Sequence, residues 1–278
     1  MTVDFTKFPF PSLQQPQAAT LTEAIKAEPV ASGFVVVALK ATDADDFAGN
    51  VREFARFVRA KAASTGLVDI TAYRQLRRDE LGGAVPFDQP ICEAVLRDAA
   101  NRESTREASE MTASIALGNA RANWVLLVEF RTPELASEAV RAWDGGADGF
   151  TALTRATTAH TVGAFRNMMR YASVSRDPNV IQFFNLFPSP GKREVLWPAW
   201  QEALPWFFEV GEIRSSFPLL ALDPEQPILL VNHAHCDSIK HFLVGTLYDP
   251  RFKETLVACY AQRGVTAPMP FFCKIVPV

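Results

Sequence analysis

The chain has 278 residues, of which 48% are apolar and 11% aromatic, so it holds enough apolar material for one large core or two smaller ones. This content excludes a globally disordered chain. Lysine and arginine number 28 against 31 for aspartate and glutamate, which gives a net charge of -3. Such a balance lacks the basic excess that contacts with phosphates require, so we expect no nucleic acid partner.

Targeting signals and cysteine usage point to the cytoplasm. Residues 1–16 include Asp4, Lys7 and several prolines, and they lack the continuous apolar stretch of a signal peptide. No apolar run approaches the roughly 20 residues that cross a bilayer. The cysteines are scattered and form no CxxC pair, which favours reduced thiols over a disulfide framework. We therefore predict a cytoplasmic protein with no membrane partner.

Residues 31–172 follow the order βαββαβ, which is typical of a ferredoxin-like module. The first helix has a capping-box-like start at Thr42 and Asp45, and a second begins at Thr132 with Pro133 in its first turn. Alternating or β-branched runs predict the strands, and apolar residues at three- and four-residue spacing predict the helices. Strands are expected at 34–39, 67–76, 124–130 and 157–168, and helices at 42–58 and 132–143.

Two segments lie outside this pattern. Residues 1–30 are predicted to be an N-terminal extension. Residues 77–122 change to charged and small side chains, with one expected helix at 91–100, and are predicted to be an insertion in the first module.

The same order of elements starts again in residues 173–278, which we predict to be a second ferredoxin-like module. Its first helix is expected to be kinked or divided at Pro205, because proline removes a helical hydrogen bond. Strands are expected at 180–187, 217–222, 228–235 and 271–276, and helices at 192–210 and, in two pieces, at 239–259. The predicted fold class is α+β, with two tandem modules forming a pseudo-dimeric α/β barrel.

The doubled pattern resembles the dimeric α/β-barrel superfamily. In the second half, a helix containing Trp197, Trp200 and Trp206, and the Asp-Pro-Arg-Phe run at 249–252, resemble EthD-like and monooxygenase-like members. The resemblance implies a cleft between each sheet and its covering helices that holds a small apolar molecule. The superfamily includes cofactor-independent monooxygenases, degradative enzymes of aromatic compounds and haem-handling proteins, so the fold leaves the chemistry open.

Three of the four histidines fall within nine residues of the second half. His233 and His235 share one face of a strand, where they are predicted to be catalytic acid/base groups. A mononuclear metal site formed by these two residues and Asp237 is an alternative. The structural reading is that Asp237 caps a helix while the histidines are hydrogen bonded or solvated. For a haem, the candidate axial ligands are His160, His233, His235 and His241.

Five further residues are predicted to bind the ligand. Asn185 interrupts an apolar strand, where its amide must find a partner in the ligand or in neighbouring backbone. Trp200 could form the wall of an aromatic pocket, although helical spacing also fits it as an ordinary core residue. Asn232 directly precedes the histidine cluster. Tyr73 and Trp124, with Asn123, invite comparison with the residues that some cofactor-free monooxygenases of this fold use. The five ligand-binding candidates are Asn185, Trp200, Asn232, Tyr73 and Trp124.

The first hypothesis for function is a cofactor-independent monooxygenase or related enzyme that acts on a small aromatic or polyketide-like compound. It predicts one open cavity bordered by His233, His235 and Asn185. The alternatives are a non-catalytic binding or scaffold protein, whose clefts its own side chains fill, and the metal enzyme described above. No cofactor is expected. The expected partners are a small apolar or aromatic molecule and a second copy of the chain in a homodimer.

Overall fold

The structure of the chain is a computed structural model. It describes residues 32–43, 46–76, 122–146, 148–169, 174–188, 193–209, 213–236, 260, 263, 265 and 270–278. The predicted helices at 91–100 and 239–259, together with the predicted extension and most of the insertion, lie outside the described residues.

The described elements follow the predicted order in both halves. In the first half they are β1 (Gly33–Ala41), α2 (Ala48–Ala60), α3 (Ala62–Thr65), β2 (Leu67–Gln75), β3 (Trp124–Phe130), α6 (Pro133–Asp144), α7 (Asp148–Arg155) and β4 (Thr157–Asn167). In the second half they are β5 (Ile181–Pro188), α8 (Arg193–Glu209), β6 (Ile213–Ala221), β7 (Ile228–Cys236) and β8 (Pro270–Val276).

The eight strands form one closed antiparallel barrel in the order β1-β3-β2-β8-β5-β7-β6-β4. Each half contributes four neighbouring strands, in the order β4-β1-β3-β2 for the first half and β8-β5-β7-β6 for the second. The halves meet at two seams, β2 with β8 and β4 with β6, which occupy equivalent places in the two modules. The predicted α+β fold with a pseudo-dimeric barrel is therefore confirmed.

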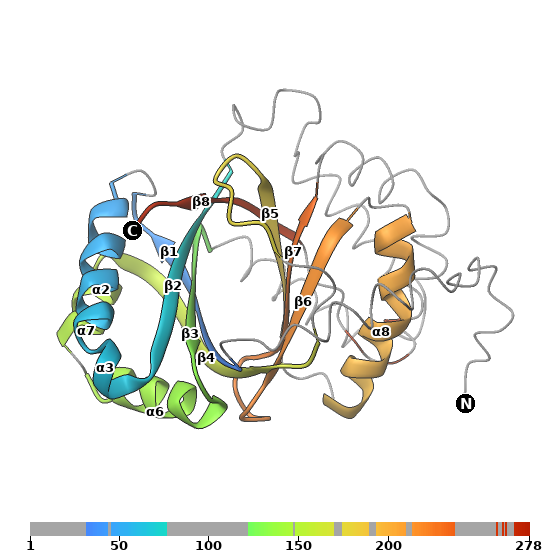
Figure 1. Cartoon of the computed structure of the whole chain (residues 1–278), viewed down its shortest axis with the longest axis horizontal. Helices are drawn as coiled ribbons and strands as arrows, with labels where there is room; N and C mark the ends of the chain where they lie inside the picture. The colour runs from blue at the N-terminus through green and yellow to red at the C-terminus, as the bar shows by residue number, and fades with distance from the viewer. Residues whose placement is uncertain are drawn as a thin grey trace, which may run out of the picture.

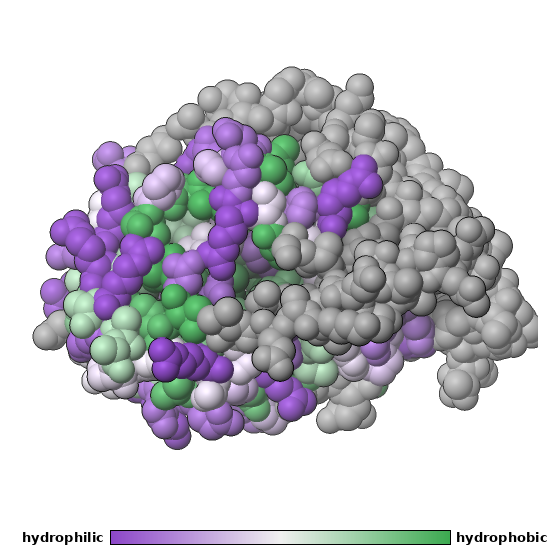
Figure 2. Space-filling view, in the orientation of Figure 1, coloured by the Kyte–Doolittle hydropathy of each residue, from purple (hydrophilic) through white to green (hydrophobic). Residues whose placement is uncertain are grey.

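The helices cover the barrel from outside. Figure 1 shows α2, α3, α6 and α7 together on one side of the strands and α8 on the opposite side. Figure 2 shows hydrophilic side chains over α2 and its neighbours, as expected for the solvent-facing side of amphipathic helices. No helix among the described residues is long and apolar enough to span a membrane.

The strand register decides which side chains enter the barrel. Tyr73 of β2 is opposite Val125 of β3 and Ile275 of β8, so these three point to the same side of the sheet. In the second half, His233 of β7 is opposite both Phe184 of β5 and Phe217 of β6, so these three side chains also point to one side of the sheet. Since rings from opposite halves meet there, as in the edge-to-face contact of Phe34 and Phe217 at 5.0 Å, this face is the barrel interior.

Helix ends were predicted with mixed success. The cap at Thr132 is confirmed, because its hydroxyl accepts a hydrogen bond from the Leu135 amide at 3.4 Å. The predicted start of the first helix at Thr42 is wrong, since α2 begins at Ala48 without a side-chain cap. Helix α8 runs as one helix through Pro205, so this proline does not divide it.

Candidate functional site

The predicted site residues lie in three separate places: the barrel interior, the outer face of the second-half sheet and, for Trp124, the outer face of the first-half sheet. His233, His235 and Tyr73 point into the barrel. Asn185 and Asn232, which are opposite each other in the β5–β7 register, point to the outer face of the second-half sheet. Neighbouring residues of one strand face opposite sides, so Asn232 and His233 cannot contact the same small ligand. The expected single cavity bordered by both histidines and Asn185 is therefore not formed.

His233 is sealed inside the barrel. Its ring stacks on Phe184 at 4.3 Å between centroids and meets the edge of Tyr73 at 5.0 Å. Burial, with smaller effects of His235 and Arg176, lowers the pKa of His233 from 6.5 to about 3. Burial likewise raises the pKa of the Tyr73 phenol above its ordinary value. Both side chains are therefore neutral at physiological pH, which suits packing better than proton transfer.

Hydrogen bonds fix the tautomer of His233. The amide nitrogen of Gln182 donates to the Ser175 carbonyl at 2.8 Å, which turns the Gln182 Oε1 toward His233. The His233 Nε2 lies 3.0 Å from that oxygen, and an amide oxygen can only accept, so Nε2 carries the proton. The segment between the two halves thus determines, through Gln182, which ring nitrogen of the buried His233 carries the proton.

His235 is held by the same segment. Its Nδ1 accepts a hydrogen bond from the Ser175 amide at 3.3 Å, so Nδ1 carries no proton. The hydroxyl of Ser215, 2.6 Å away, is therefore the donor in the second contact with Nδ1. We call His233, His235, Gln182, Ser175 and Ser215 the histidine network. Its hydrogen bonds hold the linker, which is described at residues 174–180 between β4 and β5, on the barrel.

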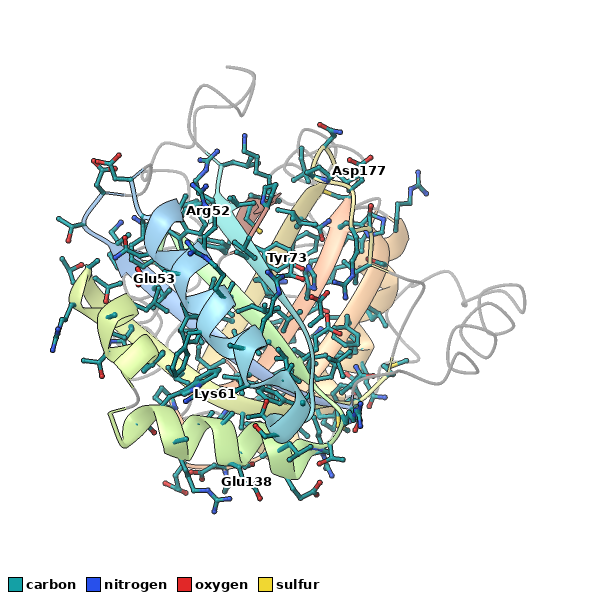
Figure 3. All side chains as sticks on the ribbon, turned by 60° about the vertical axis from the view of Figure 1, so that its left-hand side comes forward. Arg52, Glu53, Lys61, Tyr73, Glu138 and Asp177 are labelled. Carbon is teal, nitrogen blue, oxygen red and sulfur yellow. The ribbon has the colours of Figure 1, made fainter. Side chains whose placement is uncertain are left out.

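Arg176, next in this linker, joins it to the first half. Its guanidinium contacts Asp69 of β2 and donates to Glu129 of β3 at 2.7 Å. Burial lowers the pKa of Arg176, but the negative charges of Glu129 and Asp69 together raise it by more, so the net shift is upward. Figure 3 labels Tyr73 on β2 and Asp177 of the same linker. The linker is thus tied to both halves of the barrel.

Replacing this arginine should loosen the linker. In Arg176→Met the Glu129 side chain, which is buried, loses its ion pair with the guanidinium. Because Arg176 itself is more than half exposed, we expect a loss of about 1 kcal/mol in the free energy of unfolding by urea. Arg56→Met, on the exposed side of α2, is the matched control and should change the stability little. Equal urea midpoints for the two variants would show that the linker contact contributes nothing.

The described residues do not assemble a metal site. Within them, no group of three or more His, Cys, Asp and Glu side chains is placed to hold a metal ion. The histidine network already uses one ring nitrogen of each histidine: the His233 Nε2 is hydrogen bonded to Gln182, and the His235 Nδ1 to Ser215. Asp237 and His241 lie outside the described residues, and His160 is exposed on β4.

The outer face of the second-half sheet carries a different polar group, which we call the amide site: Asn185, Asn232 and Ser216. Ser216 donates to the Asn232 Oδ1 at 2.7 Å. Asn185 is 5% exposed, and its Oδ1 has no hydrogen-bond partner among the described residues. Native proteins rarely leave a buried amide oxygen unsatisfied, so this atom needs an explanation.

Aromatic side chains surround the amide site. Phe183 and Phe187 precede and follow Asn185 by two residues on the same face of β5, and both are buried. Tyr260 meets the ring of Phe187 edge-on at 6.1 Å. The surroundings are apolar, so the unsatisfied oxygen has a high energetic cost.

Helix α8 contributes Trp200. This helix contacts β6 and β7, and Trp200 is 2% exposed in the apolar cluster that also contains Leu220 and Leu230 of those strands. Its ring stacks on Trp197 at 5.2 Å. The helix therefore covers the same face of the sheet that presents the amide site.

Trp124 lies elsewhere. It is fully buried beneath α2, 5.8 Å from the ring of Phe47, on the opposite face of the first-half sheet from Tyr73. Asn123 forms two hydrogen bonds with the backbone of Ala41, at 2.7 and 3.0 Å. These three side chains therefore do not converge on one site, which ends the comparison drawn from the sequence.

Sequence reasoning missed residues that the structure brings into these sites, among them Ser215, which bonds to His235. Ser216 was not singled out, although it follows the strand periodicity that places it on the face of Asn232. Ser175 and Arg176 belong to a segment between elements, where no periodic pattern signals their contacts. Only the fold brings them onto the barrel.

No protein-family model matches the chain, and no curated protein matches it significantly. Solved structures do. An anthrone oxidase-like protein matches with a TM-score of 0.55 at 12% identity, over 90% of this chain and 93% of that one.

Two further matches are weaker. A candidate monooxygenase from Fusobacterium nucleatum has a TM-score of 0.46 at 6% identity, over 90% of this chain and 94% of that one. DyPB from Rhodococcus jostii RHA1 has a TM-score of 0.45 at 11% identity, over 91% and 95%. Because the first match spans nearly the whole of both chains, this protein shares the fold of the anthrone oxidase-like protein, and the register shows this fold to be two tandem ferredoxin-like modules closed into one barrel.

Proposed function

We propose that the chain binds a small aromatic or polyketide-like compound on the outer face of the second-half sheet and oxygenates it without a cofactor. The unsatisfied amide oxygen of Asn185 carries this proposal. A buried acceptor among aromatic rings is costly unless a ligand supplies the donor. Asn232 and Trp200 belong to the same face and complete the binding surface.

The proposal gives His233 and His235 no contact with the substrate. They lie on the opposite face of β7 from Asn232, and their ring nitrogens are held by Gln182 and Ser215. In place of the acid/base role expected from the sequence, we assign them to holding the linker.

The anthrone oxidase-like relative in fold supplies a reaction to test. In the oxidation of anthrone, the carbon between the two aromatic rings loses two hydrogens and gains one oxygen, which gives anthraquinone. Dioxygen is the oxidant: one of its atoms becomes the new carbonyl oxygen and the other leaves as water with the two hydrogens. No electrons are left over, so no reducing cofactor is needed.

Purified full-length protein should consume one dioxygen per anthraquinone formed from anthrone, faster than the background without protein and in the presence of a chelator. Asn185→Leu should lower kcat/KM about threefold to tenfold, the value of one hydrogen bond. The same variant should be more stable by about 1 kcal/mol, because it removes an unsatisfied polar group. Asn50→Leu, on α2 of the first half, is the matched control.

The outcomes separate the hypotheses. A rate equal to the background, together with no binding of anthrone, would contradict the proposal and favour the scaffold alternative. Activity that a chelator removes would favour the metal enzyme. Activity unchanged in Asn185→Leu would show that the reaction occurs elsewhere.

A further inference from the structure

We infer that the amide site recognises a ligand hydroxyl group that donates one hydrogen bond and accepts another, so that the substrate class is phenols and enols. This inference rests on the proposed function, because it concerns the same face of the sheet. It adds the polar group that the ligand must carry and a positioning role for Ser216.

Ser216 sets the orientation of Asn232. The Ser216 hydroxyl, on β6, is 0% exposed and donates to the Asn232 Oδ1 at 2.7 Å. The oxygen of the amide is thereby turned toward β6, and the Nδ2 group lies on the other side of the amide. Asn232 therefore presents a donor whose direction Ser216 fixes.

Asn185 supplies the complementary acceptor. It is directly opposite Asn232 in the register of β5 and β7, where paired residues on one face have Cβ atoms about 4.5–5.5 Å apart. Its Oδ1 is buried and unpartnered within the described part of the chain. The two amides thus offer one donor and one acceptor side by side, without bonding to each other.

A hydroxyl group satisfies both amides at once. Its O–H donates to the Asn185 oxygen and its lone pair accepts from the Asn232 nitrogen. An ether or a ketone can only accept and leaves the Asn185 oxygen unsatisfied, and a hydrocarbon leaves both groups unsatisfied. The aromatic residues around Asn185 fit the ring that carries the hydroxyl.

Equilibrium dialysis of the full-length protein against three naphthalene probes tests this reading. 1-Naphthol donates and accepts, 1-methoxynaphthalene only accepts, and naphthalene does neither. We expect 1-naphthol to bind tightest, about threefold to tenfold more tightly than naphthalene, with the methoxy compound closer to naphthalene. Asn185→Leu should abolish this preference. Ser216→Ala should reduce it while the affinity for naphthalene stays the same, which a merely structural role of Ser216 would not produce.

Failure of the inference is distinguishable from failure of the proposed function. If all three probes bind equally to the wild type and both variants, the hydroxyl reading is overturned while the apolar site stands. If no probe binds, the proposed function fails and the inference falls with it. Urea unfolding of each variant confirms that it is folded, and Asn185→Leu should unfold at the higher urea concentration.

Discussion

Lowering the pH from 7 to 5 should cost the folded protein about 2 kcal/mol through His233 alone. In the unfolded chain an imidazole titrates near 6.5, whereas burial holds the pKa of His233 in the fold at about 3. Between these two values the unfolded chain binds the proton and the folded protein does not. Acid therefore favours unfolding, and the stability is fully present above about pH 6.5 and is lost progressively as the pH falls toward 3.

Urea denaturation at pH 7 and pH 5 measures this loss. His233→Gln keeps a side chain able to donate to Gln182 but removes the titrating group, so the part of the pH dependence due to His233 should disappear. His160→Gln changes an exposed histidine of β4 and should keep the wild-type pH dependence. If His233→Gln lost as much stability between pH 7 and 5 as the wild type, the buried neutral histidine would be excluded as the cause.

The second large effect is expected at Trp200. Truncating a buried tryptophan removes its apolar contacts and leaves a cavity, which costs about 3–5 kcal/mol. Trp200 is 2% exposed in the cluster between α8 and the sheet, so Trp200→Ala should reach this range in urea or thermal unfolding. The variant should also lose binding of 1-naphthol and naphthalene together, because the apolar covering of the face is gone.

Trp197→Ala is the matched control for this change. Trp197 stacks on Trp200 but is only partly buried, so its truncation should cost clearly less. Equal losses for the two tryptophans would mean that the helix is held by its exposed side as much as by the sheet. A loss of stability without any loss of probe binding would place the ligand away from α8.

The order of elements could be predicted from the sequence, whereas the faces of the strands could not. Runs such as 34–39 and 124–130 identify strands through their β-branched residues. The same runs are buried on both sides, against the helices and against the barrel interior, so their composition does not distinguish one side from the other. The single cavity expected at His233, His235 and Asn185 is not formed, because Asn185 pairs with Asn232, which faces the side of β7 opposite to His233.

For the histidines, the shared strand face could be predicted from the sequence, but their surroundings could not. Their position on one face of a strand was predicted and is confirmed by the register of β7. What surrounds them depends on the closed barrel: Ser175 comes from the linker and Gln182 from another strand. Three histidines within nine residues favoured a chemical role, and the fold gives two of them, His233 and His235, packing and hydrogen bonds.

The two seams of the barrel bear on how copies of the chain can associate. In each half the outer strands, β2 and β4 in the first and β8 and β6 in the second, are paired across to the other half. The described barrel consequently offers no row of unpaired backbone N–H and C=O groups to which a neighbouring molecule could add a strand. Among the described residues, the surfaces left for a homodimer contact are therefore those of side chains on the helices, and single substitutions there could separate the copies without opening either barrel.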